Sequence, residues 1–446
     1  MVKFTPSPRE IKSVRRHLCA DALYALLRRG FREISDQRQE GAPTALVDAL
    51  MSAVAMFSLK DPSLLAFDER RNDDNLKNLF GIQHVPCDTH VRECLDPLDP
   101  ESLRPLFGDV FRALQRGKVL EHFVFYQGHY LLLLDGTGYF SSQNIHCGAC
   151  QQKVNKATGE VTYQHQMLGA VIAHPDHKEV IPLAPEPILK QDGDNKNDCE
   201  RNATKRLLPK IRQEHPRLRL IVVEDSLASN APHIRDLKAQ RMSFILGVKP
   251  GDHVFLFDQV LRAFEEDRVT TLSWHRGDVL CEISFVNGLP LNESNQDLIV
   301  NFLRYAEYAA DGHEQKLFTW ITDLRITQGN AKLFTRGGRG RWKIENETFN
   351  TLKNQGYHFK HNYGHGVQHL SVVLAMLMML TFLVDQVQQI CCPLFQAVWK
   401  KLGTKRALWD NLRSHFRHFI FQSMKHLYEV ILSGSGKVAA PVFDTS

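Results

Sequence analysis

The sequence has few of the features that mark secreted, membrane or fibrous proteins. Its 446 residues include nine cysteines, an odd number without the dense spacing of a disulfide framework, so we expect reduced thiols. With 27 glycines and 19 prolines, the composition excludes collagen and wholesale disorder. A signal peptide requires an apolar segment after its charged N-terminus, and none follows here. The longest apolar run, residues 370–384, is shorter than the roughly 18–20 residues that span a bilayer, so a soluble, cytoplasmic protein without a membrane partner is expected.

A large excess of charge of one sign is also absent. The 55 lysines and arginines outnumber the 50 acidic residues by only five, which is compatible with a polyanion partner without requiring one. What is present is the composition of a folded protein, with 43% hydrophobic and 24% charged residues, long enough for two to four domains.

Hydrophobic spacing divides the chain into six parts. Residues 1–120 have helical spacing, and residues 121–248 alternate between apolar strands and helices, which is typical of an α/β domain. Residues 249–334 form a β-rich insertion, in which residues 252–260 and 330–336 are predicted strands. The core resumes over residues 335–366, which open with a basic, glycine-rich loop at 335–342, and it is followed by helices over 367–432 and a flexible tail at 433–446.

Three acids stand where the α/β pattern would bring them together. Asp135 ends an apolar strand, Asp225 ends a second, and Glu345 lies in the first turn of the helix after the insertion. The carboxyl ends of neighbouring strands are where open α/β sheets place their sites. Because converging carboxylates repel one another, such a cluster needs a cation, and two Mg²⁺ or Mn²⁺ ions suit oxygen ligands and phosphoryl transfer. Taken singly, an acid at a strand end is more often a helix cap.

The segments around these acids resemble a known family. LDGT at Leu134–Thr137, VED at Val223–Asp225 and RWKIENETFNTLKNQGY at Arg341–Tyr357 are similar to DDE transposases of bacterial insertion sequences, in the branch with a β-rich insertion before the glutamate. The resemblance covers the chain from about residue 60. It implies an RNase H-like core interrupted by the insertion, with Asp135, Asp225 and Glu345 as ligands of two metal ions. It further implies cleavage of DNA at transposon ends and joining to target DNA, carried out by a homodimer on paired ends.

Two positions depart from the signature of that branch, which is Tyr, two residues, Arg, three residues, Glu, six residues, Lys. Arg341 and Glu345 fit it, within a W-x-I-E context. Gly338 stands at the Tyr position and Leu352 at the Lys position, with Lys353 one residue later. The alternative glutamate, Glu347, points about 200° away on a helix, so only one of the two can face the metals; the W-x-I-E context favours Glu345.

Several basic and aromatic residues are candidates for DNA contact. Arg341 can clamp a phosphate beside the cut or pair with Glu345 one turn away. The lost signature tyrosine could be replaced by Tyr357 or Tyr363. The remaining candidates are Arg339 and Lys353, the N-terminal pair Arg15 and Arg16, and a basic stretch at 400–425 interleaved with aromatics. For each of the basic stretches, a solvated helix face is the alternative interpretation.

A Cys/His group near the first strand suggests a second, structural metal. His146, Cys147 and Cys150 form H-C-x-x-C, and His165 follows fifteen residues later. Thiolates and imidazoles at such spacing can complete a tetrahedral zinc site, and the alternative is a reduced hairpin dithiol.

Two other functions compete with the active transposase: a transposase-derived DNA-binding protein without catalysis, which the altered Tyr and Lys positions keep open, and a stand-alone metal-dependent nuclease.

Overall fold

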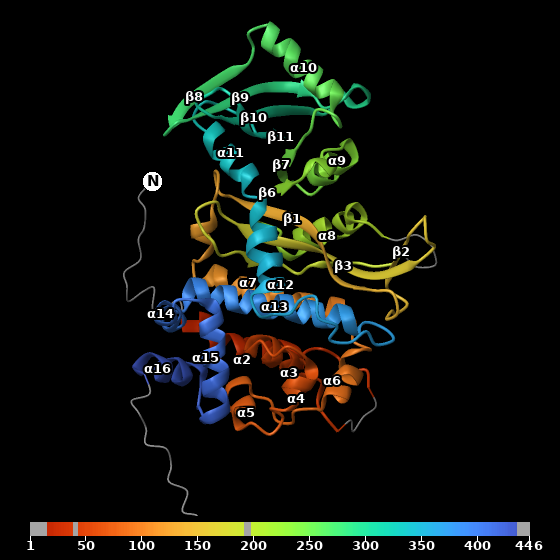
Figure 1. Cartoon of the computed structure of the whole chain (residues 1–446), viewed down its shortest axis with the longest axis vertical. Coiled ribbons are helices and arrows are strands. Elements are labelled where there is room, and N and C mark those ends of the chain that lie inside the picture. Colours follow the sequence, from red (N-terminus) through yellow and green to blue (C-terminus); the bar gives the residue numbers. More distant parts are fainter. Residues whose placement is uncertain (1–15, 39–42, 191–197, 435–446) are drawn as a thin grey trace, which may run out of the picture. The chain divides into compact units, whose positions relative to one another are not determined.

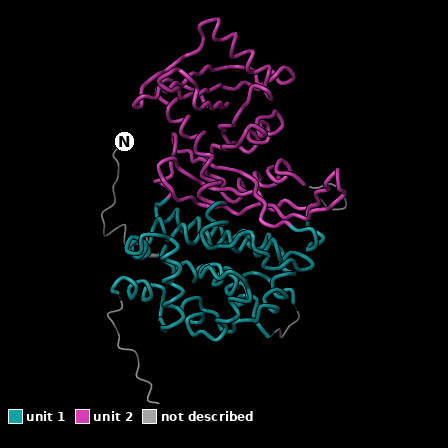
Figure 2. The backbone as a smooth tube through the Cα atoms, viewed as in Figure 1, with its two compact units in different colours: residues 1–119, 142–150, 350–446 teal, residues 120–141, 151–349 magenta. Residues whose placement is uncertain are grey.

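A computed structural model describes residues 16–38, 43–190 and 198–434, which divide into two compact units (Figures 1 and 2). Unit 1 comprises residues 1–119, 142–150 and 350–446, and unit 2 comprises residues 120–141 and 151–349. Unit 1 is helical, and unit 2 carries a large mixed sheet. The mixed α/β class predicted from the sequence is therefore confirmed.

Two helices form the centre of unit 1. They are α3 (Leu46–Leu59) and α13 (Leu370–Cys391), which pack against each other and are buried along almost their whole length. A helix that is apolar all round needs neighbours on every side, and the remaining helices supply them. These are η1 (Arg16–Leu18), α2 (Ala20–Arg32), α4 (Leu64–Asp68), α5 (Asp74–Phe80), α6 (Asp88–Leu95), η2 (Pro100–Leu103), α7 (Arg104–Arg116), α12 (Asn350–Asn354), α14 (Pro393–Leu402), α15 (Lys405–His418) and α16 (Met424–Ser433).

Helix α13 is longer than the apolar run that predicts it. It continues past Val384 through the mostly polar residues 385–389 to Cys391. The whole helix has 22 residues and is long and apolar enough to cross a membrane by length and composition alone. However, 94% of its most apolar window is buried inside the protein. This is the environment of a core helix in a soluble protein, in agreement with the prediction.

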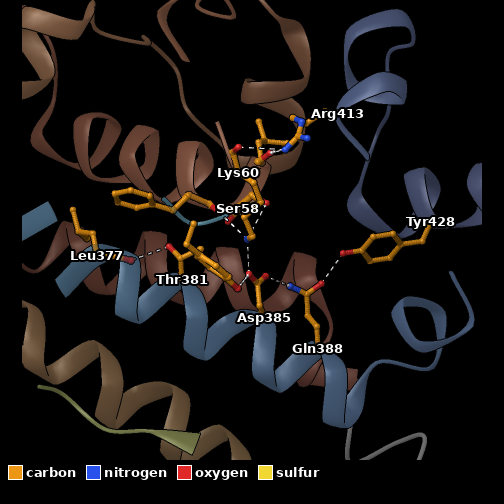
Figure 3. A network of polar contacts seen from close by, with 11 residues as sticks. Ser58, Lys60, Leu377, Thr381, Asp385, Gln388, Arg413 and Tyr428 are labelled. Atoms are coloured by element: carbon orange, nitrogen blue, oxygen red, sulfur yellow. Dashed lines mark hydrogen bonds and ion pairs between the residues drawn. The ribbon is translucent and has the colours of Figure 1, made fainter. Parts of the chain in front are cut away.

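A buried ion pair crosses the core of unit 1 (Figure 3). The Lys60 ammonium donates to Asp385 on α13 at 2.7 Å and to the carbonyl of Phe57 at 2.9 Å, and both charged side chains are at most 1% exposed. The hydroxyl of Tyr357 also donates to Asp385, and its ring lies 3.9 Å from the Lys60 ammonium. Burial lowers the pKa of Lys60, and the charge of Asp385 opposes that shift. Because both charges are paired and hydrogen-bonded, they are tolerated in this apolar core.

The sheet of unit 2 has the strand order β2-β3-β1-β6-β7-β11-β10-β9-β8, with two short strands, β4 and β5, paired to β3. Strands β1, β6 and β7 are parallel neighbours whose central residues are buried, as expected for apolar strands covered on both faces. The bounds are β1 (His129–Ser142), β2 (Gln151–Val154), β3 (Val161–Ala173), β4 (Ile181–Pro182), β5 (Glu186–Ile188), β6 (Arg219–Glu224), β7 (Ser243–Gly247), β8 (Thr270–Arg276), β9 (Val279–Pro290), β10 (Ile299–Tyr308) and β11 (Glu314–Thr322).

Helices pack against this sheet at several strands. Helix α8 contacts β5 and β3, α9 contacts β7, and α11 contacts β7, β9 and β10. Their bounds are α8 (Glu200–Glu214), α9 (Ala231–Ala239), α10 (Val254–Glu265) and α11 (Ala331–Arg339), with short turns η3 (Leu120–Phe123), η4 (Ser226–Ala228), η5 (Glu293–Asn295) and a π-helical segment, η6 (Ile344–Phe349).

The β-rich segment differs from the prediction in two ways. Strands β8 to β11 form an antiparallel meander that continues the same sheet, because β11 pairs with β7, as the green and teal strands of Figure 1 show. Residues 252–260 and 330–336, predicted as strands, belong mostly to helices α10 and α11, and the predicted loop at 335–342 includes the end of α11. Short apolar runs fit both a strand and a buried helix, and here helical packing against the sheet decides.

Candidate functional site

The parallel pairing of β1 and β6 brings Asp135 and Asp225 to one edge of the sheet. Leu133 lies opposite Val223, and each aspartate follows two residues later in the chain, Asp135 within β1 and Asp225 directly after β6. The prediction that Asp135 ends its strand is wrong, because β1 continues to Ser142. Because neighbouring strands are about 4.8 Å apart, equal offsets from a paired position put the two aspartates side by side. This edge is the carboxyl end of both strands' paired segments, the usual place for a site in an open α/β sheet.

Asp135 is the centre of the charge cluster at this edge. Its carboxylate accepts one hydrogen bond from the guanidinium of Arg341 at 3.1 Å and another from the backbone N–H of Gly136 at 3.1 Å. Burial raises the pKa of Asp135, the charge of Arg341 opposes that shift, and the negative charges of Asp225 and Glu345 add to it. All three predicted acids therefore interact electrostatically, and one cation of the chain already compensates part of their charge.

Asp225 is held by the turn that follows β6. Its carboxylate accepts the backbone N–H of Leu227 at 2.9 Å and so caps the short helix η4. The neighbouring strand β7 approaches closely, because a Cβ on Gly247 would lie 3.1 Å from the backbone nitrogen of Ser226. The capping role considered from the sequence is thus real, and it fixes where the carboxylate stands.

Glu345 and Glu347 both lie in the π-helical segment η6. The charge of Glu345 acts on Asp135, whereas the charge of Glu347 acts on Lys343, whose pKa burial lowers and Glu347 raises. Of the two glutamates, Glu345 is therefore the one whose charge acts on Asp135, and its assignment as the third catalytic acid stays a prediction. π-Helical segments are rare and are frequently found at functional sites.

Packing against β3 fixes the position of η6. Phe349 is buried, and a Cβ on Gly169 would lie 2.8 Å from its ring. Ile344, at the start of the segment, is fully buried. Because both ends of η6 are anchored in apolar contacts, the exposed Glu345 between them is presented from a rigid support.

A fourth carboxylate, which the sequence did not indicate, joins the cluster. Glu200 is the first residue of α8, and a Cβ on Gly136 would lie 2.0 Å from its Oε1. Burial raises the pKa of Glu200, and the charges of Asp135, Asp225 and Glu224 raise it further. In the sequence, Glu200 is an acid in the first turn of a polar helix, which a helix dipole alone explains, so no pattern distinguishes it.

Two of the three predicted acids line a pocket of about 720 Å³ in unit 2, and Glu345 is not among its lining residues. Asp135, Asp225, Glu200 and Glu224 contribute to its wall, and so do the cations Lys153, Arg201 and Lys205. Glu224 is buried and binds His233 at 2.6 Å. Although burial disfavours a charged imidazole, the Glu224 carboxylate raises the pKa of His233. The wall of the pocket thus combines acidic and basic side chains.

The predicted DNA contacts have different environments. Arg341 lies at the acid cluster and pairs with Asp135, not with Glu345 as the alternative interpretation had it. Arg339 lies 3.5 Å from the carboxylate of Glu307 on β10, and its guanidinium stacks over Tyr305, so it is held by the meander.

The other predicted contacts are in unit 1 or outside the described residues. Tyr357 and Tyr363 are buried, with hydroxyls bonded to Asp385 and to a backbone carbonyl, so the expectation that either contacts phosphate is wrong. Lys353 is half-buried on α12. Arg15 and the side chain of Arg16 lie outside the described residues.

Most cations of the predicted basic stretch at 400–425 have partners in unit 1. Lys401 donates to the carbonyl of Ile431 at 2.8 Å, and Arg413 donates to the carbonyl of Leu59 at 3.1 Å. Trp409 and Phe416 are buried. These contacts favour the structural interpretation of the stretch over a nucleic-acid surface.

Packing explains the two departures from the family signature. A Cβ on Gly338 would lie 2.5 Å from the indole ring of Trp320 on β11, so no larger residue fits there in this chain. Leu352 is fully buried in unit 1. Both positions therefore serve packing here.

Three residues of unit 1 form a cluster that could hold a metal such as zinc. They are Cys147, Cys150 and His365, whose ligand atoms lie within 4.8 Å of one another. The two sulfur atoms are 3.8 Å apart, and the Cys150 sulfur is 3.2 Å from Nε2 of His365. Nδ1 of the same imidazole faces the side-chain oxygen of Asn362 at 3.4 Å, as in metal sites where a second polar group orients the ligand.

The ligand set differs from the predicted one. His146 is exposed and does not join the cluster, and His365, more than two hundred residues away, takes its place. Spacing along the chain cannot reveal so distant a ligand. His165 lies buried on β3 of unit 2, and its role as a ligand stays a prediction.

The carboxylates at the sheet edge are not as close to one another as the ligand atoms of the Cys/His cluster are. Across the described ranges, the cluster around Cys147 is the one group of Cys, His, Asp or Glu side chains close enough together to hold a metal. The oxygen donors at the sheet edge are of the type that Mg²⁺ prefers, but Arg341 pairs with Asp135 in this arrangement. A magnesium site here would require that pair to separate.

In comparisons with known proteins, no family model and no curated protein matches the chain.

Proposed function

We propose that the chain is a metal-dependent transposase that cuts and joins DNA, with Asp135, Asp225 and Glu345 as its catalytic acids. The observation that carries the proposal is the shared offset of Asp135 and Asp225 on paired parallel strands, with the charge of Glu345 acting on the same carboxylate. An RNase H-like core, a homodimer on paired DNA ends and two Mg²⁺ or Mn²⁺ ions belong to this proposal.

The reaction divides into two phosphoryl transfers. In the first, a water oxygen attacks a DNA phosphorus, and the bond to the 3′ oxygen breaks, so that a 3′-hydroxyl and a 5′-phosphate result. In the second, that 3′-hydroxyl attacks a phosphodiester of target DNA and displaces its 3′ oxygen. Bound Mg²⁺ supplies charge neutralisation and activates the attacking oxygen. The chain's carboxylates hold the cations, and the protein positions the reacting groups.

Arg341 has two roles in this scheme. In the arrangement described, it compensates Asp135. When cations and DNA occupy the edge, its guanidinium is free to bind a phosphate oxygen through its planar fork. Arg341 is thus paired with the Asp135 carboxylate when DNA is absent and with a DNA phosphate when DNA is bound.

The spacing of Lys353 agrees with the π-helical segment. Hydrogen bonds of a π-helix run from residue i to i+5, one residue more than in an α-helix. If the family spacing assumes an α-helix, a residue that follows a π-helical segment therefore stands one position later in the sequence. Lys353 stands one position later than the family spacing requires, which supports Glu345 as the signature glutamate.

A nicking assay on supercoiled DNA tests the proposal. We expect nicking that requires Mg²⁺ or Mn²⁺ and stops with chelator. The changes Asp135→Asn, Asp225→Asn and Glu345→Gln should each lower the rate more than the 10–100-fold known for residues that only support metal ligands. Glu347→Gln is the matched control and should keep the rate.

The same assay separates the competing functions. Metal-dependent nicking without joining of donor ends to target DNA indicates a stand-alone nuclease. DNA binding without nicking indicates a protein that has lost catalysis. If Glu347→Gln abolishes nicking and Glu345→Gln does not, the assignment of the glutamate is wrong.

We also propose that the Cys/His cluster binds zinc as a structural ion. Tetrahedral bonds of about 2.3 Å to sulfur put two thiolates about 3.8 Å apart, the separation seen for Cys147 and Cys150. Metal analysis of the purified protein should find one zinc per chain. Cys147→Ser and His365→Ala should lose it, and His146→Ala should retain it. His165→Ala tests the remaining predicted ligand. If the wild-type protein contains no zinc, the proposal is wrong.

A further inference from the structure

A second pocket of unit 2 lies at the other end of the strands that carry the acids. It measures about 600 Å³, and its wall includes His129 and Arg219, the first residues of β1 and β6 and a paired position of the two strands. Arg219 precedes Asp225 by six residues. At about 3.3 Å per residue, the two ends of the strand are about 20 Å apart.

The lining of this pocket is basic. Four arginines and one histidine contribute to it, and no described acidic residue does. The other lining residues are proline, leucine, alanine and glutamine. The basic residues are Arg212, Arg217, Arg219, Arg241 and His129.

One arginine of the four builds the pocket. Arg212 donates to the carbonyls of Gln240 at 2.8 Å and Leu218 at 2.8 Å, and so joins the connection before β6 to the one before β7. Burial lowers the pKa of Arg212, and the positive charge of Arg241 lowers it further, which agrees with guanidinium groups held close together.

The other three arginines have their charges available. Arg217, Arg219 and Arg241 are exposed, and within the described residues their guanidinium groups have no ion-pair or hydrogen-bond partner. Like charges around one hollow repel each other, so an anion in the pocket relieves that repulsion. Guanidinium binds phosphate oxygens through two parallel N–H bonds, so a phosphate suits this pocket.

We propose that this pocket binds backbone phosphates of the DNA that reaches the acid edge of the same sheet. The inference rests on the proposed function. Phosphates along one strand of duplex DNA advance about 3.4 Å each, so a path of about 20 Å spans about six nucleotides. The pocket is thus a second anchoring point about six nucleotides from the phosphate that is cut, and it adds affinity without reading sequence.

The test measures how salt weakens binding to duplex DNA. In the pocket variant, Arg217, Arg219 and Arg241 are each changed to Gln. Each phosphate that the variant no longer neutralises lowers the slope of log affinity against log salt by about 0.9, so we expect the slope to fall by about 2 to 3 between 50 and 200 mM salt. A variant with the same three residues changed to Lys keeps the charges and should keep most of the slope. Thermal unfolding of each variant establishes that it is folded.

A charge-matched control separates a local contact from net charge. It removes three exposed cations of unit 2 that lie outside both pockets, Lys156, Lys249 and Arg262. The control should change the slope by less than one. Equal slopes in the pocket variant and the control overturn the inference. If the wild type binds and nicks DNA while the pocket variant keeps its slope, only this inference fails; if the wild type does not bind DNA, the proposed function fails with it.

Discussion

Glu307 on β10 gathers three cations and provides the sharpest test of the electrostatics of unit 2. Its side chain is 1% exposed, and the cationic groups of Arg276, Lys316 and Arg339 lie at 2.9, 3.2 and 3.5 Å from its carboxylate. The hydroxyl of Tyr305 donates to it at 2.7 Å. The perturbation is Glu307→Gln, which keeps the shape of the side chain and removes its charge.

The pKa of Glu307 sets the expected magnitude. Burial opposes its ionisation, but hydrogen bonds from Tyr305, Lys316 and Arg276 outweigh that effect and lower its pKa from 4.5 to about 2. At 1.36 kcal/mol per pH unit, this difference corresponds to about 3 kcal/mol of folding free energy at pH 7. Since the side chains of Arg276 and Lys316 are 56% and 50% exposed, water screens part of it, and we expect about 2 kcal/mol.

The assay is urea unfolding of the full chain, wild type and variant, at several pH values. A depressed folded-state pKa contributes stability that is fully present above the unfolded value near 4.5. That contribution is lost as the pH falls toward 2. The difference in unfolding free energy should therefore be about 2 kcal/mol at pH 7 and should shrink below pH 4.5.

A matched exposed pair is the control. Glu266 binds Arg268 at 2.6 Å, but the two side chains are 57% and 47% exposed. Glu266→Gln should cost at most about 1 kcal/mol, as surface pairs do. If Glu307→Gln costs no more than this control, or if its cost does not change between pH 7 and pH 3, the reasoning from burial and charge is refuted.

Three further changes test other parts of the molecule. Gly136→Ala puts a methyl group where Glu200 now lies, so we expect nicking to fall at least about tenfold while the melting temperature stays nearly constant. Lys60→Met leaves Asp385 buried without its cation and should lower the unfolding free energy by about 3–5 kcal/mol, measured in urea. Gly338→Tyr introduces the tyrosine of the signature that the sequence resembles, but the ring overlaps an indole ring, so it should cost about 3 kcal/mol or more and reduce the yield of folded protein.

Each of these has an opposing outcome. Unchanged nicking after Gly136→Ala removes Glu200 from the site. A cost below about 1 kcal/mol for Lys60→Met means that Asp385 is not left as an uncompensated buried charge when Lys60 is removed. A well-folded Gly338→Tyr protein shows that the sheet can move away from this helix.

Strand and helix patterns account for much of the fold, and they fail at short apolar runs. The buried strands β1, β6 and β7 follow from continuous apolar residues that end in turn signals. Residues 254–265 carry apolar residues at spacings that suit a strand or a helix, and only packing against β9 makes them helix α10. The continuation of the sheet through β11 likewise depends on a pairing between distant strands, which no local pattern contains.

The candidate site shows the same division. An acid that directly follows a continuous apolar run can be recognised from neighbouring residues, which is why Asp135 and Asp225 are predictable, although β1 continues beyond Asp135 to Ser142. Glu200 and His365 are not, because each reaches its partners through segments far away in the chain. Glu345 is the intermediate case: its local context indicates it, and the π-helical segment that presents it depends on Phe349 packing on β3.

The amino-acid sequence by itself determined the mixed α/β class, the apolar run that becomes a core helix, and the acids and thiols available for chemistry, because composition and short-range periodicity carry that information. Tertiary structure alone decided which of them meet: that Arg341 compensates Asp135, that Tyr357 is a core residue, and that His365 approaches Cys150. The physical reason is that burial, charge pairing and ligand geometry depend on distances between residues that are remote in the chain, and folding sets those distances.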